Sequence, residues 1–498
     1  MVSLSLKGIR EQVEPFQSEL NEEYYLNWAG LKEEMQAAVV FERYAHLFSR
    51  EAVDVLQAAF ESSHGTDDQR SAGYLRAFCA LGHVEHSVRA LSDKVATFTA
   101  QSRIEFDGEA IPYRSVPVLI RNEPRRERRK RLFEAELIEL DKLNTILYER
   151  LERMHDVATA LGFRSYKDMC SKLKGIDYAA LEESMEEMLR RTERTYVDGM
   201  EELLRSTVGV SLPEAFVYDI GYAFRGQRYD DVFSKEGLSG AFFNTLRGMG
   251  IDPDRYRNIK IDSDDRPGKS PRAFCAPVKV PDDIRLVIRP SGGFDDYAAL
   301  FHEGGHSWHF GSTRPDLEPE YRYLGDNSVS EAFAFLFDHL VSDANWLQVR
   351  LGMKDPSEFV RFSALRRLFF LRRYAAKLVY ELKLHAGTLS PEFKEVYRTC
   401  LQRCLRFRHS EKRYLEDVDD AFYCAEYLRA WMLDAQLRSA LEEEFGEQWF
   451  ADPKAGGYLR ELWSYGQKYT ADELVKTIGY AGLDIDPLVR ELERLASP

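Results

Sequence analysis

The sequence has 498 residues, 44% of them hydrophobic, and a formal net charge of −15, so general affinity for nucleic acid or anionic membranes is not expected. It contains no run of about 18 uncharged apolar residues, as a membrane helix requires, and its N-terminal segment lacks the apolar core of a secretory signal. Six cysteines are too few for a disulfide scaffold, so we expect reduced, mostly buried thiols in a cytoplasmic protein.

Most of the chain has the apolar periodicity of amphipathic helices. The clearest segments are 22–48, 49–64, 178–204 and 358–385. The basic run RNEPRRERRKR at 121–131 is interleaved with Glu123 and Glu127 and leads into a further helical pattern. We interpret it as the charged face of a long helix with ion-pair partners three and four residues away, not as a nucleic-acid site.

Only a few segments have the composition of strands. Residues 116–120 are one candidate, and residues 273–280 and 284–288 flank a short turn and predict a hairpin. The segment RPGKS just before the hairpin resembles the end of a phosphate-binding loop, but that loop requires a glycine where Ser263 stands. We therefore predict no nucleotide site there.

The segment YAALFHEGGHSWHF at 297–310 has the pattern of a helix but contains two adjacent glycines. A glycine inside a helix costs about 1 kcal/mol relative to alanine, so this pair requires a structural reason. We expect the helix to begin near Phe294. Its candidate N-terminal caps are Ser291, Asp295 and Asp296.

Two histidines of this segment have the spacing of metal ligands. His302 and His306 are four residues apart and project from one face of the helix, where two imidazoles can bind a single ion, most often zinc. Glu303 lies beside that ion and not on it, in a position to accept a proton from an activated water molecule. This is the H-E-x-x-H arrangement of zinc peptidases.

A third ligand must come from elsewhere in the chain. The long metalloprotease signature would place a histidine where Ser312 stands, and His309 is too near on the same helix, so we interpret His309 as a histidine that packs behind the ligands. Glu318 and Glu320 lie in a segment that has the composition of a loop. Glu331 is the better candidate, because it begins a strongly apolar helix in which a carboxylate needs a partner.

Other roles remain open for the residues around Glu331. It could be a simple N-terminal charge on its helix, with Ser330 or Ser328 as the cap. Asp338 lies seven residues further along the same helical face, where it could orient one of the ligand histidines.

The string HEGGHSWH, with a glutamate 25 residues after its second histidine, resembles the thimet oligopeptidase / oligoendopeptidase F family of zinc peptidases, and is closest to the oligoendopeptidase F branch. Further segments resemble this family as well: 122–169 resembles its inner helices, 266–278 its strand-entry segment and 470–495 its C-terminal tail. The resemblance therefore covers most of the chain, and the zinc motif is its most specific part.

The resemblance implies a mainly α fold, with two lobes that face each other across a deep channel and a small β-sheet next to the zinc helix. On that basis residues 1–190 would form a lid-like outer lobe and residues 191–498 the catalytic lobe. It also implies one Zn²⁺ per chain on His302, His306 and Glu331, with Glu303 as the general base.

The family also supplies tyrosine donors for the oxyanion, from a late helix. Tyr427 matches the family position best and Tyr423 less well. The histidine that the family has before them would fall near Asp417, and the nearest histidine of this chain, His409, is too far back. The family usually has glycine at Gly305, which suggests a close backbone approach there.

Two further expectations concern the walls of the site. Gly304 stands where a larger residue is usual, and we expect it to give a roomier cleft wall. The substrate would extend along the strand that begins with Ala273, Phe274 and Cys275, through main-chain hydrogen bonds that tolerate varied side chains.

The predicted function is hydrolysis of internal bonds in short unfolded peptides by zinc-activated water. One alternative is an exopeptidase or dipeptidase on a related helical zinc fold. Another is a peptide-binding homologue without turnover. It is motivated by Cys424 and Ala425, which stand where the family commonly has further tyrosines. The sequence predicts neither the preferred peptide nor the oligomeric state.

Overall fold

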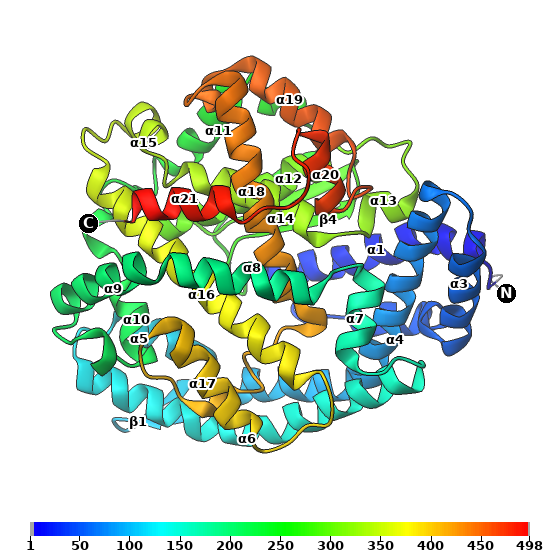
Figure 1. Ribbon diagram of the computed structural model, residues 1–498, viewed down its shortest axis with the longest axis horizontal. Coiled ribbons are helices and arrows are strands. Elements are labelled where there is room, and N and C mark those ends of the chain that lie inside the picture. The colour runs from blue at the N-terminus through cyan, green and yellow to red at the C-terminus, as the bar shows by residue number, and fades with distance from the viewer. Residues whose placement is uncertain (1–3, 497–498) are drawn as a thin grey trace. The chain divides into compact units, whose positions relative to one another are not determined.

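The computed structural model describes residues 4–496, and helices dominate it outside two small sheets (Figure 1). The predicted mainly α class is confirmed. None of the helices in residues 4–496 combines the length and the apolar character needed to cross a membrane. All six cysteines are free thiols and, apart from the half-buried Cys275, they are buried, as expected.

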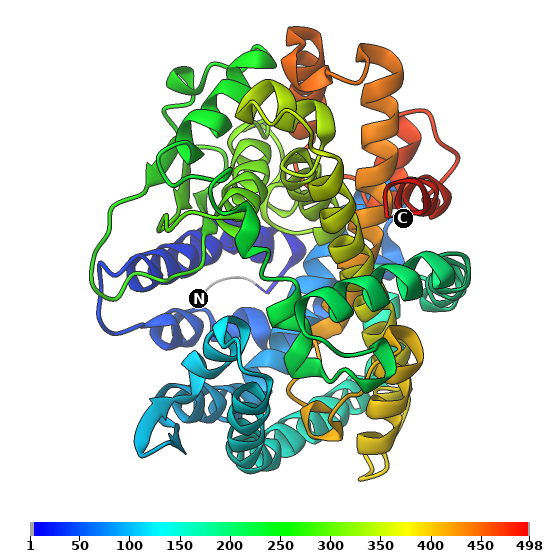
Figure 2. The ribbon, with the colours of Figure 1, turned by 90° about the vertical axis from the view of Figure 1, so that its left-hand side faces the viewer.

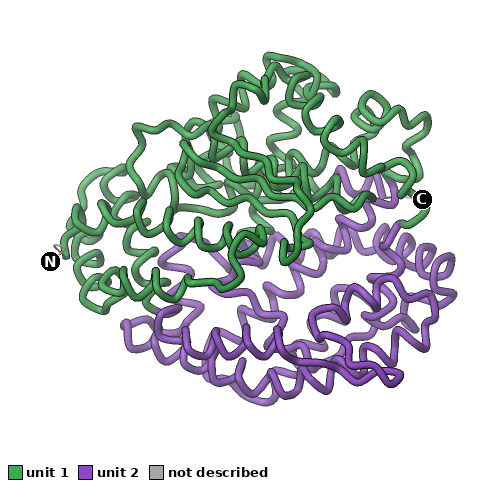
Figure 3. The backbone as a smooth tube through the Cα atoms, turned by 180° about the vertical axis from the view of Figure 1, so that it is seen from behind, with its two compact units in different colours: residues 1–83, 227–360, 426–488 green, residues 84–226, 361–425, 489–498 purple. Residues whose placement is uncertain are grey.

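The chain forms two compact units, each assembled from three separate stretches (Figure 3). Unit 1 comprises Met1–His83, Gln227–Val360 and Glu426–Leu488, and unit 2 comprises Val84–Gly226, Arg361–Ala425 and Val489–Pro498. This division differs from the single boundary expected at residue 190, which lies inside a helix of unit 2. Four of the five passages between the units fall within helices: α4 (Thr66–Gln101), α16 (Ser357–Leu384), α18 (Tyr423–Phe445) and α21 (Asp486–Leu495). The apolar pattern continues through these helices, so no change in composition marks the division.

Unit 1 contains a three-stranded sheet and the helices that pack around it. Its further helices are α1 (Leu6–Trp28), α2 (Ala37–Arg43), α3 (Arg50–Ser62), α11 (Leu238–Gly248), α12 (Phe294–Gly311), α13 (Pro319–Tyr323), α14 (Asn327–Leu340), α15 (Ala344–Leu351), α19 (Pro453–Ser464) and α20 (Ala471–Thr477). The strand order is β3-β5-β4, with β3 (Ile259–Asp262) parallel and β4 (Phe274–Lys279) antiparallel to β5 (Asp283–Val287). The predicted hairpin is confirmed, and β4 is an edge strand of this sheet.

Unit 2 is a helical body with one small hairpin, β1 (Arg103–Phe106) and β2 (Glu109–Pro112), seen as the blue arrows at lower left in Figure 2. Its further helices are α5 (Val116–Asn122), α6 (Arg126–Ala160), α7 (Tyr166–Lys174), α8 (Tyr178–Arg191), α9 (Glu193–Thr207), α10 (Val217–Ala223) and α17 (Phe393–Leu405). Most of the basic run lies on α6 as predicted. There, however, Arg126 and Arg129 form ion pairs with the buried Asp219 from α10.

The strand predicted at 116–120 is wrong, because these residues form α5. Pro117 occupies the first turn of the helix, where its missing N–H is not needed. Val116 and Ile120 are buried, whereas Val118 and Leu119 are exposed. Burial at every fourth residue means that one face of the helix packs against α6 and α10. This tertiary packing outweighs the strand preference of the β-branched residues.

Helix α12 begins at the predicted residue but is capped differently. Its N-cap is Gly293, with a φ of 95° that a side chain would strain, and this residue makes no side-chain cap. Asp296 instead reaches back, and its carboxylate accepts hydrogen bonds from the backbone N–H groups of Ser291 and Gly292. Of the three candidate caps, Asp296 therefore satisfies the turn that precedes the helix.

The two adjacent glycines of α12 face two different neighbours. A Cβ at Gly305 would lie 2.5 Å from the carbonyl oxygen of Phe333 and 2.6 Å from the Cα of Ala334, both in α14. A Cβ at Gly304 would lie 2.3 Å from the ring of Phe242, in α11. The expected close backbone approach at Gly305 is confirmed. The roomier cleft wall expected at Gly304 is wrong, because the buried Phe242 ring fills that space.

We predict that Gly305→Ala destabilises the protein by about 1–3 kcal/mol, because the added methyl group overpacks a contact with backbone atoms that cannot rotate away. Urea unfolding monitored by circular dichroism measures this loss. Gly240→Ala is the matched control, since Gly240 lies in α11 with nothing within 4 Å of its added Cβ. That control should be stabilised by about 1 kcal/mol. Equal stability of Gly305→Ala and wild type would contradict the packing argument.

Candidate metal centre

Three side chains from α12 and α14 converge in unit 1. His302, His306 and Glu331 each offer a ligand atom, and these atoms all lie within 4.8 Å of one another. The Nε2 atom of His302 is 3.3 Å from Oε2 of Glu331, and Nε2 of His306 is 3.6 Å from the same oxygen. The structure therefore brings together the three residues that the sequence predicts as metal ligands.

The other ring nitrogen of each histidine has a partner on α14. Nδ1 of His302 is 3.0 Å from Oδ2 of Asp338, and Nδ1 of His306 is 2.7 Å from Oγ of Ser330. Partners of this kind fix the orientation and the tautomer of an imidazole, and they leave Nε2 for a metal. Asp338 thus lies where the sequence predicts, whereas Ser330 was considered only as a helix cap.

The distances agree with a four-coordinate metal site. Zinc binds nitrogen and oxygen ligands at about 2.0–2.2 Å, so two ligand atoms of a tetrahedral site lie about 3.4 Å apart. The observed 3.3 and 3.6 Å separations bracket this value. Two imidazoles and one carboxylate form the ligand set of several catalytic zinc sites, which keep a fourth position open. The residues of this chain therefore fit zinc.

The electrostatics of the site favour a cation. Burial alone would lower the pKa of His302, but hydrogen bonds to Asp338 and Glu331 outweigh it and raise that pKa well above its ordinary value. Burial would likewise raise the pKa of Glu331, but the two imidazoles outweigh it and hold that pKa below its usual range. The carboxylates of Asp338 and Glu331 thus stabilise a positively charged group at this point, even though the site is buried.

Glu303 is held against the edge strand of the sheet. Its Oε2 atom accepts a hydrogen bond of 2.8 Å from the backbone N–H of Cys275, in β4. Because Glu303 follows His302 on the same helix, its carboxylate lies beside the ligand set, where the sequence predicts the general base. The hydrogen bond from β4 fixes the orientation of the Glu303 carboxylate through one of its two oxygens.

His309 packs behind the ligand histidines. It is fully buried, with Nδ1 3.2 Å from Oγ of Ser330 and Nε2 3.1 Å from the carbonyl oxygen of Gly466. Burial lowers its pKa to about 3, so the ring is neutral at physiological pH. Its contact with Ser330, the partner of His306, agrees with the supporting position predicted for it.

The other carboxylates considered as ligands have partners of their own. Glu320 lies in α13, not in the expected loop, and is fully buried. Its carboxylate accepts hydrogen bonds from Nε of Arg10, at 3.0 and 3.2 Å, and from the hydroxyl of Ser71. Glu318 forms a longer ion pair with the same arginine, at 3.8 Å. Both carboxylates are therefore outside the ligand set.

Of the two predicted tyrosines, Tyr427 belongs to unit 1, together with the metal ligands. The centroid of its ring is 5.5 Å from that of Phe335, which is itself 5.4 Å from that of His302. Tyr423 belongs to unit 2. The role of each tyrosine as an oxyanion donor stays a prediction.

The two positions considered for the family's histidine also lie in unit 2. Asp417, near which it was expected, accepts two hydrogen bonds from the guanidinium of Arg373 and one from the hydroxyl of Tyr397. His409 is buried nearby in the same unit and lines a cavity with both charged residues.

A buried ion pair anchors the start of α14. The helix begins at Asn327, one turn before the position expected, and its N-cap is Asp326, not Ser328 or Ser330. The carboxylate of Asp326 accepts hydrogen bonds from the N–H of Ser328 (3.0 Å), the N–H of Ala471 (2.9 Å) and Nη2 of Arg429 (2.7 Å). Burial would raise the pKa of Asp326, but Arg429 and these hydrogen bonds outweigh it and lower that pKa.

Comparison with known proteins shows the fold. No protein-family model and no curated protein matches the sequence. A solved structure of PZ peptidase A with an inhibitor matches 98% of this chain and 91% of its own, with a TM-score of 0.69 and 16% identity. A provisionally assigned oligoendopeptidase F matches with the same TM-score and identity over 98% and 90% of the two chains. Another, from Bacillus anthracis str. Ames, has a TM-score of 0.66 and 15% identity over 98% and 89%. The chain therefore has the fold of PZ peptidase A and oligoendopeptidase F.

We predict that Asp326→Asn lowers the free energy of unfolding by about 2–4 kcal/mol at pH 7, because Arg429 loses the charge of a buried partner. The folded-state pKa of Asp326 is depressed, so its charged form stabilises the fold above the unfolded-state pKa of about 3.9. That contribution disappears as the pH falls through the folded-state pKa. Urea unfolding at several pH values should thus show the difference between variant and wild type shrinking below about pH 4. A difference that stays constant down to pH 3 would contradict this role.

Proposed function

We propose that this protein is a zinc-dependent oligopeptidase that hydrolyses internal bonds of short unfolded peptides, with one Zn²⁺ per chain. The observation that carries the proposal is the convergence of His302, His306 and Glu331, with Glu303 next to the first ligand. The shared fold with PZ peptidase A and oligoendopeptidase F supports it. We also propose that it works in the cytoplasm, in keeping with its buried free thiols.

His302 and His306 would hold the metal through Nε2, and Glu331 through a carboxylate oxygen. When bound, zinc lowers the pKa of water to about 7 and polarises a carbonyl group. Asp338 and Ser330 keep the two imidazoles in the ligating orientation. The chain thus supplies three ligands and the groups that orient two of them.

Glu303 is the proposed general base. Its carboxylate would accept a proton from the attacking water and then donate that proton to the leaving amine of the peptide. The hydrogen bond from Cys275 holds one carboxylate oxygen, so the direction of the base is set before substrate binds. Tyr427, which packs on Phe335 in the same unit, is the proposed donor to the oxyanion.

The outer edge of β4 is the proposed site for the peptide backbone. Cys275 and Pro277 face away from β5, because the Cys275 N–H donates to Glu303 and the Pro277 carbonyl accepts from Asn21 of α1. The Cys275 N–H and the Pro277 carbonyl are therefore already bonded, and we propose that an extended peptide adds to the edge formed by Ala273, Phe274 and Cys275 through its remaining main-chain groups. The base would then lie beside the added strand.

Aromatic side chains adjoin this edge. Trp28 is 44% exposed, which is unusual for so large an apolar side chain. Its ring stacks on Tyr24, with centroids 5.1 Å apart, and meets the edge of Phe274 at 5.5 Å. We propose that this cluster binds an apolar side chain of the substrate.

Cleavage of a peptide library by the zinc-loaded protein tests the proposed reaction. Glu303→Gln should retain zinc but lose about 10²–10⁴-fold in kcat, because it removes the proton acceptor. Glu318→Gln is the matched control, since it makes the same change at a half-exposed carboxylate of the same unit.

Mass spectrometry of products from peptides blocked at both ends should show internal cleavage. Release of single residues or dipeptides from free ends alone would favour an exopeptidase, and no hydrolysis at all would overturn the enzymatic proposal.

We predict that Trp28→Ala raises KM about 2–10-fold for peptides with an aromatic residue near the cleaved bond and leaves kcat unchanged, because one aromatic contact is lost. Peptides with glycine at that position should show no change. Val349→Ala removes another exposed apolar side chain of unit 1 and serves as the control. An equal effect on both peptides would contradict a side-chain subsite at Trp28.

A further inference from the structure

Ser330 connects the candidate ligand His306 to a second, fully buried histidine, His309. The Oγ atom of Ser330 is 2.7 Å from Nδ1 of His306 and 3.2 Å from Nδ1 of His309. A hydroxyl group has a single proton, so it can donate to only one of these nitrogens and has to accept from the other. The imidazole that receives this proton therefore decides which tautomer the ligand adopts.

The direction of these hydrogen bonds is set by the carbonyl group of Gly466. Nε2 of His309 is 3.1 Å from this carbonyl oxygen, which can only accept a hydrogen bond. The two groups that the ring nitrogens contact, a carbonyl and a hydroxyl, are uncharged, and the ring is fully buried, so the imidazole is neutral and has one N–H. That N–H is on Nε2, which leaves Nδ1 of His309 as an acceptor.

The position of the Gly466 carbonyl is well defined. Gly466 follows α19 with a φ of 57°, and a Cβ there would lie 2.7 Å from the carbonyl oxygen of Tyr321 and 2.8 Å from Cγ2 of Thr313. The next residue, Gln467, donates its N–H to the same Tyr321 carbonyl at 2.8 Å. The turn after α19 is thus held against α13, and its carbonyl is held against His309.

The hydrogen bonds consequently run in one direction, from His306 to Gly466. Because Nδ1 of His309 is an acceptor, the hydroxyl of Ser330 donates to it. Because the only proton of Ser330 is then used, its oxygen accepts from Nδ1–H of His306. This leaves His306 with a lone pair on Nε2, the nitrogen that lies 3.6 Å from Oε2 of Glu331.

We propose that His309 is a positioning residue for the metal ligand His306 and acts through Ser330. Without His309, the hydroxyl proton of Ser330 could turn to Nδ1 of His306 and favour the tautomer that carries its proton on Nε2, where it blocks a metal. His302 needs no such chain, since its Nδ1 partner is the carboxylate of Asp338. The inference rests on the proposed function, because it concerns the same zinc site.

Neutron diffraction from a crystal of the metal-free protein, exchanged into D₂O, tests the direction of the hydrogen bonds. We expect deuterium on Nε2 of His309, on Oγ of Ser330 towards His309, and on Nδ1 of His306. Deuterium on Nδ1 of His309, or its absence from Nδ1 of His306, would overturn the proposal. This measurement needs no variant and no bound metal.

Zinc affinity, measured by competition with a chelator, tests the role of His309. His309→Leu should weaken zinc binding about tenfold, whereas His309→Asn, which keeps an acceptor in the place of Nδ1, should retain most of it. In a Ser330→Ala background, His309→Leu should cause no further loss, because its effect passes through the hydroxyl. Equal losses from His309→Leu in both backgrounds would indicate a purely structural role and overturn the proposal.

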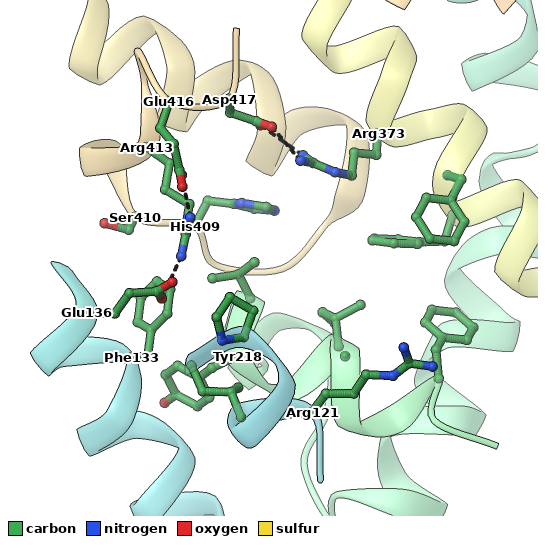
Figure 4. A pocket seen from close by; sticks show the side chains of 18 of the residues that line it. Arg121, Phe133, Glu136, Tyr218, Arg373, His409, Ser410, Arg413, Glu416 and Asp417 are labelled. Carbon is green, nitrogen blue, oxygen red and sulfur yellow. Dashed lines mark hydrogen bonds and ion pairs between the residues drawn. The ribbon is translucent and has the colours of Figure 1, made fainter. Parts of the chain in front are cut away.

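His409 provides the matched control. It is a buried histidine of unit 2 that lines a cavity (Figure 4), whereas the metal ligands belong to unit 1. His409→Leu should leave zinc affinity unchanged, and an equal loss in this variant would overturn the specific role of His309. Absence of zinc binding by the wild type would overturn the proposed function together with this role. Zinc binding with deuterium on Nδ1 of His309 would overturn the role alone.

Discussion

The close packing of α12 on α14 is the constraint on which the candidate site depends. Gly305 allows the two helices to approach until a Cβ would lie 2.5 Å from the facing carbonyl oxygen. At that separation Glu331, from α14, comes within 3.3 and 3.6 Å of the two imidazoles from α12. Because α14 also carries Ser330 and Asp338, one helix supplies both the third ligand and the partners of the first two. A wider separation would disturb all of these contacts at once.

The same arrangement explains why so apolar a helix carries several polar residues. α14 is largely buried, and an unpaired carboxylate inside it would be strongly destabilising. Each polar group instead has a defined partner: Asp326 pairs with Arg429, Ser330 and Asp338 with the imidazoles, and Glu331 with the Nε2 atoms of both. The negative charge that collects at Glu331 is what makes a cation favourable there. Packing and electrostatics therefore select the same ligand geometry.

Sequence reasoning found the parts of the site that follow from local spacing. The four-residue separation of His302 and His306 fixes their common face. Glu331 could be identified because it is an isolated carboxylate in an apolar segment. Sequence reasoning missed Ser330 as a histidine partner and Phe242 as the neighbour of Gly304, because both contacts join segments distant in the chain. It also assigned a strand at Val116, where a helical burial period overrides β-branched composition. Sequence reasoning did not predict the division into these two units, because four helices continue through the boundaries.

The central claim is that the Nε2 atoms of His302 and His306 and a carboxylate oxygen of Glu331 share one divalent cation. Anomalous scattering from a crystal of the zinc-treated protein, recorded on both sides of the zinc absorption edge, tests it most directly. The account predicts a single strong peak in each chain, about 2.0–2.2 Å from all three atoms. A peak at other residues, or no peak at these three after zinc treatment, would contradict it.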